Sequence, residues 1–190
     1  MSVQPIRIIG DPVLHKVAKP VAYPSPSVDE IVNELFETMR AAPGVGLAAP
    51  QIGIPLQIFV WEWTDGSGKC FSGSVINPSL QIISRVGVGR GKNHDFEGCL
   101  SVPDLRFNLG RAKQVKLLGI NPLGEPLEIE AHGWLARIFQ HEYDHLRGII
   151  YLDRLRLRDK FSAKKITKAK GWGKSGNFWV PGVDPFELRQ

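Results

Sequence analysis

The segment QHEYDHL (140–146) constrains this chain more than any other part of its sequence. Residues four positions apart lie on one face of an α-helix, so a helix here directs the imidazoles of His141 and His145 toward one point. Apolar residues on the neighbouring turns predict that the helix is buried. A buried helix with two inward histidines and Glu142 needs a compensating ion, and the pattern is typical of two metal ligands beside a general base.

Two histidines leave a metal ion under-coordinated, because catalytic zinc-type sites commonly combine three protein ligands with an open position. No histidine follows His145, so we expect the third ligand upstream. The candidates are Cys99, Cys70, His94, His132 and His15. The alternative is an exposed helix that carries these residues without an ion.

The wider pattern predicts an α+β fold in which a mainly antiparallel sheet packs around the central metal-binding helix. Ser27, with Glu30 three residues later, is typical of a capping box, and apolar residues at helical spacing follow to about Arg40. Segment 127–131 is expected to form a hairpin with 114–120. We expect strands at 56–63, 72–77, 80–88, 114–120 and 127–131, and further helices at 134–146 and 159–170.

Two other features have open interpretations. The small residues of 44–51 let the backbone run close to a ligand, and Gln51 adds an amide donor, but the segment also suits a tight packing turn before a strand. Asp144 either orients a neighbouring group or pairs with Arg147 on the helix surface.

Three motifs together resemble one family, peptide deformylase. They are GVGLAAPQ (44–51), EGCLS (97–101) and QHEYDHLRG (140–148), in the order and at the separations of that family. The start IGDPVL (9–14) is similar as well, and the resemblance covers about residues 5–158.

The resemblance implies a role for each motif residue. The implied metal ligands are Cys99, His141 and His145. Glu142 is implied as the acid and base of the reaction, with Gln51 and the backbone N–H of Leu100 stabilising the oxyanion. The substrate cleft is expected at Val45, Gly46, Glu97, Gly98 and Arg106.

The implied reaction is hydrolysis of the formyl group from the N-terminal methionine of nascent peptides, which releases formate. A thiolate with two imidazoles suits Fe(II), Zn(II), Ni(II) or Co(II), and the resemblance favours one Fe(II) ion. A metallopeptidase with the same helix is an alternative, and the lack of a downstream third ligand argues against it.

The net charge of +5 is unevenly distributed. Within 154–174 there are nine lysines and arginines, and Asp159 is the one acid. Such a cluster is typical of phosphate-binding surfaces, so a second alternative is a ribosome- or RNA-binding protein with a structural metal. Docking of an enzyme on the ribosome through this segment is compatible with both. We expect a catalytic domain at 1–158 and a basic C-terminal helix and tail at 159–190.

The remaining composition predicts an intracellular environment. With two cysteines and no signal-like apolar stretch at the N-terminus, we expect the cytoplasm, and free thiols or a metal ligand rather than a Cys70–Cys99 disulfide. No apolar run reaches the roughly 18 residues of a membrane span, so no membrane partner is expected.

Overall fold

The structure is a computed structural model that describes residues 3–22, 25, 27–84 and 95–184. Its strands are β1 (Ile6–Arg7), β2 (Gly46–Ala48), β3 (Ile58–Thr64), β4 (Cys70–Ser84), β5 (Phe96–Cys99), β6 (Val102–Asn108), β7 (Gln114–Ile120), β8 (Pro126–His132) and β9 (Phe178–Trp179). Its α-helices are α1 (Val28–Ala41), α2 (Gly133–Leu146) and α3 (Leu157–Ala169). Three short 3-10 helices are η1 (Pro12–His15), η2 (Ala49–Ile52) and η3 (Tyr151–Arg154).

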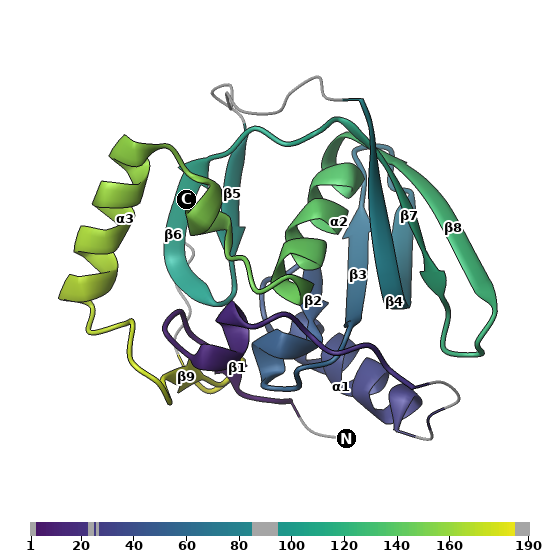
Figure 1. The fold of residues 1–190 in the computed structure, drawn as a ribbon, viewed down its shortest axis with the longest axis horizontal. Coiled ribbons are helices and arrows are strands. Elements are labelled where there is room, and N and C mark those ends of the chain that lie inside the picture. The colour runs from purple at the N-terminus through teal and green to yellow at the C-terminus, as the bar shows by residue number, and fades with distance from the viewer. Residues whose placement is uncertain (1–2, 23–24, 26, 85–94, 185–190) are drawn as a thin grey trace.

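A five-stranded antiparallel sheet, in the order β2-β3-β4-β7-β8, forms one side of the molecule. A separate antiparallel hairpin, β5-β6, lies across from it, and α2 lies between the two (Figure 1). The fold is therefore α+β with antiparallel sheets, as predicted. The predicted hairpin is also confirmed, because β7 pairs with β8 and Leu117 stands opposite Ile129.

The segments predicted as strands at 72–77 and 80–88 do form strand where they are described, but they belong to one element, β4, which has a bulge between Ile76 and Ser79. Asn77 has a φ of 50°, and its side chain bonds both the N–H and the carbonyl of Val21. The part before the bulge pairs with β3, the part after it pairs with β7, and Ile76 pairs with both. The local sequence pattern shows a break at this point, but hydrogen bonding to the neighbouring strands keeps β4 continuous through it. Residues 85–88 lie outside the described part.

The helix α1 confirms its predicted span but not its predicted cap. Ser27 already has a helical backbone, with a φ of −83° and a ψ of −6°, and its side chain makes no capping hydrogen bond. Its hydroxyl lies 3.1 Å from that of Ser25 instead. Capping needs an extended backbone at that position, so the capping-box prediction is wrong. The apolar stripe is buried as expected, at Val28, Ile31, Val32, Leu35 and Met39.

The helix α2 is buried on nearly every side. Toward the sheet, Phe139 packs against Trp61, with ring centroids 4.9 Å apart in an edge-on arrangement. Gly148 ends the helix with a φ of 70°, and a Cβ there would lie 2.8 Å from the backbone of His15. The apolar face thus fixes α2 on the sheet and turns its histidines toward the hairpin.

The C-terminal region packs onto the body. The helix α3 begins two residues before the predicted start, and β9 pairs with β1. Trp179 is 6% exposed, and its indole N–H donates to the carbonyl of Leu100 over 2.8 Å. The proposed division of the chain at 158/159 stays a prediction. Among the described residues, no helix is both long and apolar enough to cross a membrane.

Candidate metal centre and active site

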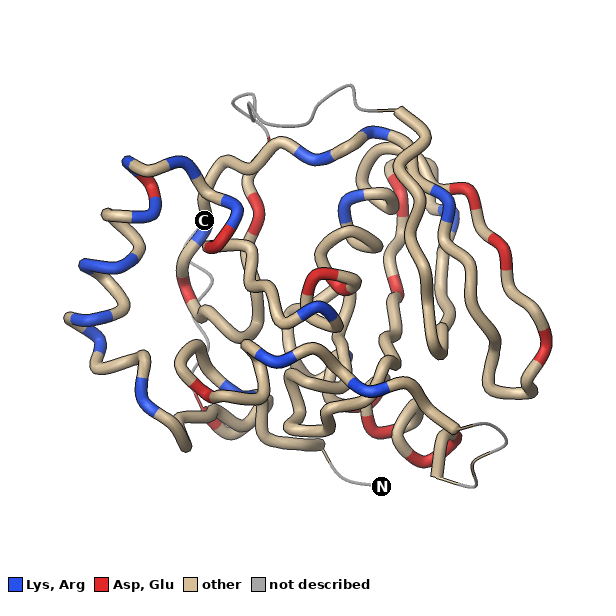
Figure 2. The backbone as a smooth tube through the Cα atoms, viewed as in Figure 1, with Lys and Arg blue, Asp and Glu red and all other residues tan. Residues whose placement is uncertain are grey.

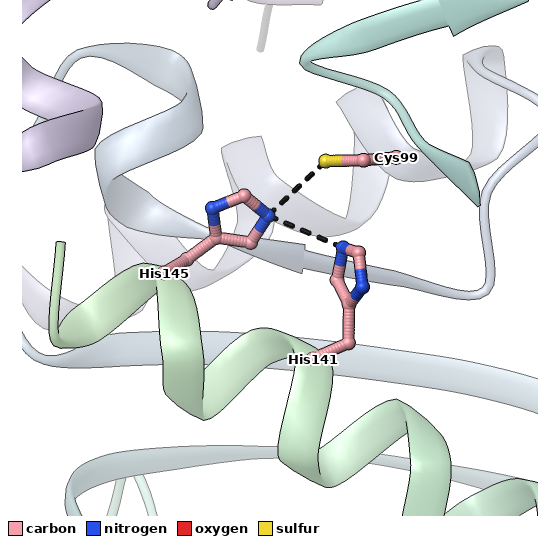
Figure 3. Close-up of side chains that lie close together, drawn as sticks. All are labelled: Cys99, His141 and His145. Carbon is pink, nitrogen blue, oxygen red and sulfur yellow. Dashed lines mark hydrogen bonds between the residues drawn. The ribbon is translucent and has the colours of Figure 1, made fainter. Parts of the chain in front are cut away.

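Three buried side chains of metal-ligand type meet between β5 and α2. Cys99 is the last residue of β5, while His141 and His145 lie one turn apart on α2. The Nε2 atom of His145 lies 3.2 Å from the Sγ atom of Cys99 and 3.2 Å from the Nε2 atom of His141. Figure 3 shows the three side chains facing one another. They come from elements far apart in the sequence, so only the fold brings them together.

The spacing of these atoms fits a metal ion. Two imidazole nitrogens held about 2.0–2.1 Å from a tetrahedral ion lie roughly 3.3 Å apart. The three ligand atoms lie within 4.8 Å of one another. Of the other sequence candidates, Cys70, His132 and His15 are exposed and lie outside this cluster, and His94 lies outside the described residues. Both cysteines are free thiols, as expected.

Glu142 stands beside the cluster in a confined space. It is 4% exposed, and its Oε2 atom has no hydrogen-bond partner among the described residues. Burial raises the pKa of Glu142 to about 7. On its other side is Gly46, where an added Cβ would lie 2.4 Å from the Oε1 atom. Glycine is needed at position 46 to leave room for this carboxylate.

Gln51 closes the opposite side of the cluster. Its Oε1 atom accepts from the N–H of Ala48 over 2.9 Å, which orients the amide. Its Nε2 atom then points at the Sγ of Cys99, 3.7 Å away, and donates to the hydroxyl of Ser101 over 3.2 Å. Leu100, next to Cys99, is held by its carbonyl through Trp179. Gln51 thus presents an amide donor to the space in front of the cluster.

A cavity opens in front of these residues. It is lined by the 43–46 segment, the β5-β6 hairpin and α2. All five residues that the sequence predicted for the substrate cleft line it, namely Val45, Gly46, Glu97, Gly98 and Arg106. The rim is apolar, because Val45, Phe96 and Trp134 are each between 38% and 49% exposed there.

Glu97 has its carboxylate behind the cluster rather than free in the cavity. Its Oε1 atom accepts from Nδ1 of His141 over 2.8 Å. An ionised carboxylate only accepts, so Nδ1 carries the proton and the Nε2 lone pair faces the cluster. Burial works against the charge of Glu97, but Arg111 and the bond from His141 hold its pKa well below the usual range.

The structure shows which of the two predicted roles Asp144 has. It is 4% exposed and accepts hydrogen bonds from Arg111 and Arg154. The predicted alternative, a surface pair with Arg147, is wrong, because Asp144 points into the protein. The neighbouring His145 is itself buried, and its burial lowers the pKa of its imidazole.

Sequence reasoning missed two arginines in this region. Arg111 and Arg137 both donate to Glu97. Arg137 stands four residues before His141 on the same helix face, so helical spacing offered a signal for it. Arg111 lies between β6 and β7 and has no local signal.

Comparison with known proteins assigns the chain. The profile of the family described as Polypeptide deformylase matches residues 3–161. The peptide deformylase of Rhodococcus opacus is 44% identical over 192 residues, which span 98% of each chain. The chain belongs to the polypeptide deformylase family. Among solved structures, the peptide deformylase of Ehrlichia chaffeensis has a TM-score of 0.80 at 32% identity, covering 90% of this chain and 97% of that one.

A second solved deformylase, from Acinetobacter baumannii, has Met-Ala-Ser bound. Its TM-score is 0.73 at 31% identity, and the match covers 81% of this chain and 99% of that one. Membership in the deformylase family agrees with the resemblance carried by the three sequence motifs. Proteins of this family are metal-dependent, and Cys99, His141 and His145 form the possible metal site of this deformylase.

Proposed function

We propose that this chain removes the formyl group from the N-terminal methionine of newly made peptides and releases formate. The observation that carries this proposal is the convergence of Cys99, His141 and His145 beside Glu142, at the base of an apolar cavity. Family membership supports it. The peptide in the Acinetobacter relative begins with methionine, which is the chain start that deformylation would leave.

One divalent ion held by Cys99, His141 and His145 fits the donor set. Two imidazoles and a thiolate suit Fe(II), which we favour, as well as Zn(II), Ni(II) or Co(II). When bound, the ion supplies Lewis-acid activation of the formyl carbonyl and a nucleophile at neutral pH. The bond from His141 to Glu97 prepares the imidazole for this role by fixing its tautomer.

Proton transfer is assigned to Glu142. Its Oε2 atom is buried and has no hydrogen-bond partner among the described residues, so it is available to hold a proton beside the ligands. In the forward reaction, the carboxylate accepts a proton from the water that adds to the formyl carbon. As the C–N bond breaks and formate leaves, the carboxyl group delivers that proton to the nitrogen of the leaving amine. The Nε2 of Gln51 and the N–H of Leu100 are assigned to the oxyanion, and loss of one such donor costs about 10²–10³ in rate.

The cavity is assigned to the methionine side chain and the following backbone. Val45, Phe96 and Trp134 supply apolar surface suited to an unbranched thioether. Gly46 and Gly98 leave space for close approach of a peptide, and the stem of Arg106 packs over Gly98, where an added Cβ would lie 3.2 Å from its Cγ. Glu97 also lines the cavity, and its side chain holds His141.

The decisive experiment measures formate release from a formyl-methionyl dipeptide. The protein is purified without oxygen, because thiolates and Fe(II) both oxidise. We expect metal-dependent release that falls by about 10²–10⁴ in Glu142→Ala, the range of a lost general acid and base. The exposed Glu128→Ala serves as a matched control and should keep full activity. No release from protein shown to carry one ion per chain would overturn the proposal.

We also propose that the basic segment 154–174 docks on the ribosome in the cytoplasm, where nascent chains emerge. Figure 2 shows Lys and Arg along α3, and Leu157 and Phe161 are 76% and 71% exposed on that helix. Two of the nine charges are engaged internally, because Arg154 bonds Asp144 and Lys170 bonds Asp104. The other seven form no ion pair with any described residue, so they can meet phosphate groups.

The test exchanges three exposed lysines of α3, Lys164, Lys165 and Lys168, for Glu. Ribosome binding at low salt is expected to weaken strongly, and binding of the original protein should fall steeply with salt. The control makes the same exchange at the exposed Lys16, Lys19 and Lys69 and should bind normally. Unchanged binding in the α3 variant would overturn the docking proposal and leave the enzymatic one intact.

A further inference from the structure

A buried guanidinium links the two elements that carry the proposed metal ligands. Arg111 lies between β6 and β7 and is 7% exposed. Its Nε and Nη2 atoms donate to the two carboxylate oxygens of Glu97 over 3.1 and 2.6 Å. Its Nη1 atom donates to Asp144 over 2.6 Å. Glu97 belongs to β5 and Asp144 to α2, so one side chain holds the strand and the helix together.

Both carboxylates stand beside the ligands. Glu97 precedes Cys99 by two residues on β5 and accepts from Nδ1 of His141. Asp144 directly precedes His145 on α2. The contacts of Arg111 therefore act on the same two backbone segments that set the distance between the thiol and the imidazoles.

The chemistry of arginine suits this position. A planar guanidinium offers several N–H donors in a fixed fork, so it can bind two oxygens of one carboxylate and still reach a second carboxylate. A lysine offers one compact charge and cannot reproduce both contacts. Because Glu97 and Asp144 are each 4% exposed, removing their shared partner leaves two buried carboxylates with one arginine each, Arg137 and Arg154, and breaks the link between them.

We propose that Arg111 is a positioning residue for the metal centre. By clamping Glu97 and Asp144, it sets the distance and orientation of Cys99, His141 and His145, and with them the affinity and geometry of ion binding. This inference rests on the proposed function only in requiring an ion at these three ligands.

Two other arginines contact the same carboxylates, and one of them provides a control variant. Arg137 also reaches Glu97, but through one nitrogen, which it shares with the carbonyl of Leu109. Arg154 donates to Asp144 from the outer side, and its side chain is 43% exposed. The variant Arg154→Gln thus disturbs a partner of the same network without touching Glu97.

The experiment compares Arg111→Lys, Arg111→Gln and Arg154→Gln. On metal-free protein, Zn(II) affinity is measured by competition with a chromophoric chelator, and the Co(II) form is examined by its absorption spectrum. We expect Arg111→Lys to lower the Zn(II) affinity by about 10–100-fold and to alter the Co(II) bands. Arg154→Gln should keep both, although it destabilises the fold. If Arg111→Gln fails to fold, the charge-retaining Arg111→Lys decides alone.

A double-variant cycle tests the route through Glu97. In a Glu97→Gln background, the further change Arg111→Lys should cost less Zn(II) affinity than it costs in the original protein. If the losses of Zn(II) affinity from the two substitutions are fully additive, the proposed role of Arg111 is wrong. It is also wrong if Arg111→Lys folds and keeps the original Zn(II) affinity and Co(II) spectrum. An original protein that binds neither ion would overturn the proposed metal centre itself, so the two failures are distinguishable.

Discussion

The helices α2 and α3 have nearly equal lengths, 14 and 13 residues, and opposite surroundings. The first is buried along most of its length and carries charged groups inward, whereas the second buries Ala163 and directs its charges to solvent. Among the described residues, Arg137 and Asp144 of α2 each have a partner of opposite charge, and Glu142 has none. On α2, the buried carboxylate without a charged partner indicates a catalytic site. On α3, the exposed row of charges indicates a surface for binding a partner.

The largest expected difference between α2 and α3 is in how much the loss of one phenylalanine ring destabilises the fold. Phe139→Ala on α2 removes a fully buried ring and should lower the free energy of unfolding by about 3–5 kcal/mol. Phe161→Ala on α3 removes a ring that is 71% exposed and should change it by less than about 0.5 kcal/mol. Urea unfolding of both variants measures the difference. Equal losses would show that α3 is buried against a partner in solution.

Glu142 predicts a pH dependence in the metal-free protein. Its pKa is raised to about 7, so its contribution to stability is present below the unfolded value of 4.5 and lost as the pH rises through 7. Relative to the original protein, Glu142→Gln should therefore gain about 3 kcal/mol in unfolding free energy between pH 4.5 and pH 8. Chemical denaturation of metal-free protein across this range measures the gain. A pH-independent difference between the two proteins would contradict the shift.

Gly46 predicts an effect on turnover with little effect on the fold. An added Cβ would meet the Oε1 of Glu142, so Gly46→Ala should displace the carboxylate and lower kcat by about 100-fold. Gly66→Ala is the matched control, because an added Cβ there meets nothing within 4 Å. Kinetics with a formyl-methionyl dipeptide separate the two variants. Full activity of Gly46→Ala would show that Glu142 can move without cost.

The smallest effect is expected on α3. The triple exchange of Lys164, Lys165 and Lys168 for Glu should leave kcat/KM for a dipeptide unchanged, because none of the three lines the cavity. Stability should shift by less than about 0.5 kcal/mol at each site. A loss of dipeptide turnover would mean that α3 acts on the active site as well as on a docking partner.

The local pattern of apolar residues was enough to predict the helices and the best-defined strands. The apolar spacing of α1 and α2 lies within one segment each, as do the apolar stretches of β3 and β7. Their spans are therefore predicted to within about two residues of the structure. The short strands β1, β2 and β9 were missed, because a strand of two or three residues has no period to detect. β5 and β6 were also missed as strands, although the motif that ends β5 was recognised.

The sequence by itself determined that two imidazoles share a helix face, since a spacing of four residues needs nothing beyond the helix. It also singled out the motif that contains Cys99. Only the tertiary structure decided that Glu97 turns its carboxylate to His141, that Arg111 joins Glu97 to Asp144, and that β4 is continuous through Asn77. These contacts join residues many positions apart, and a buried charge finds its partner through packing of the whole chain, which no local period encodes.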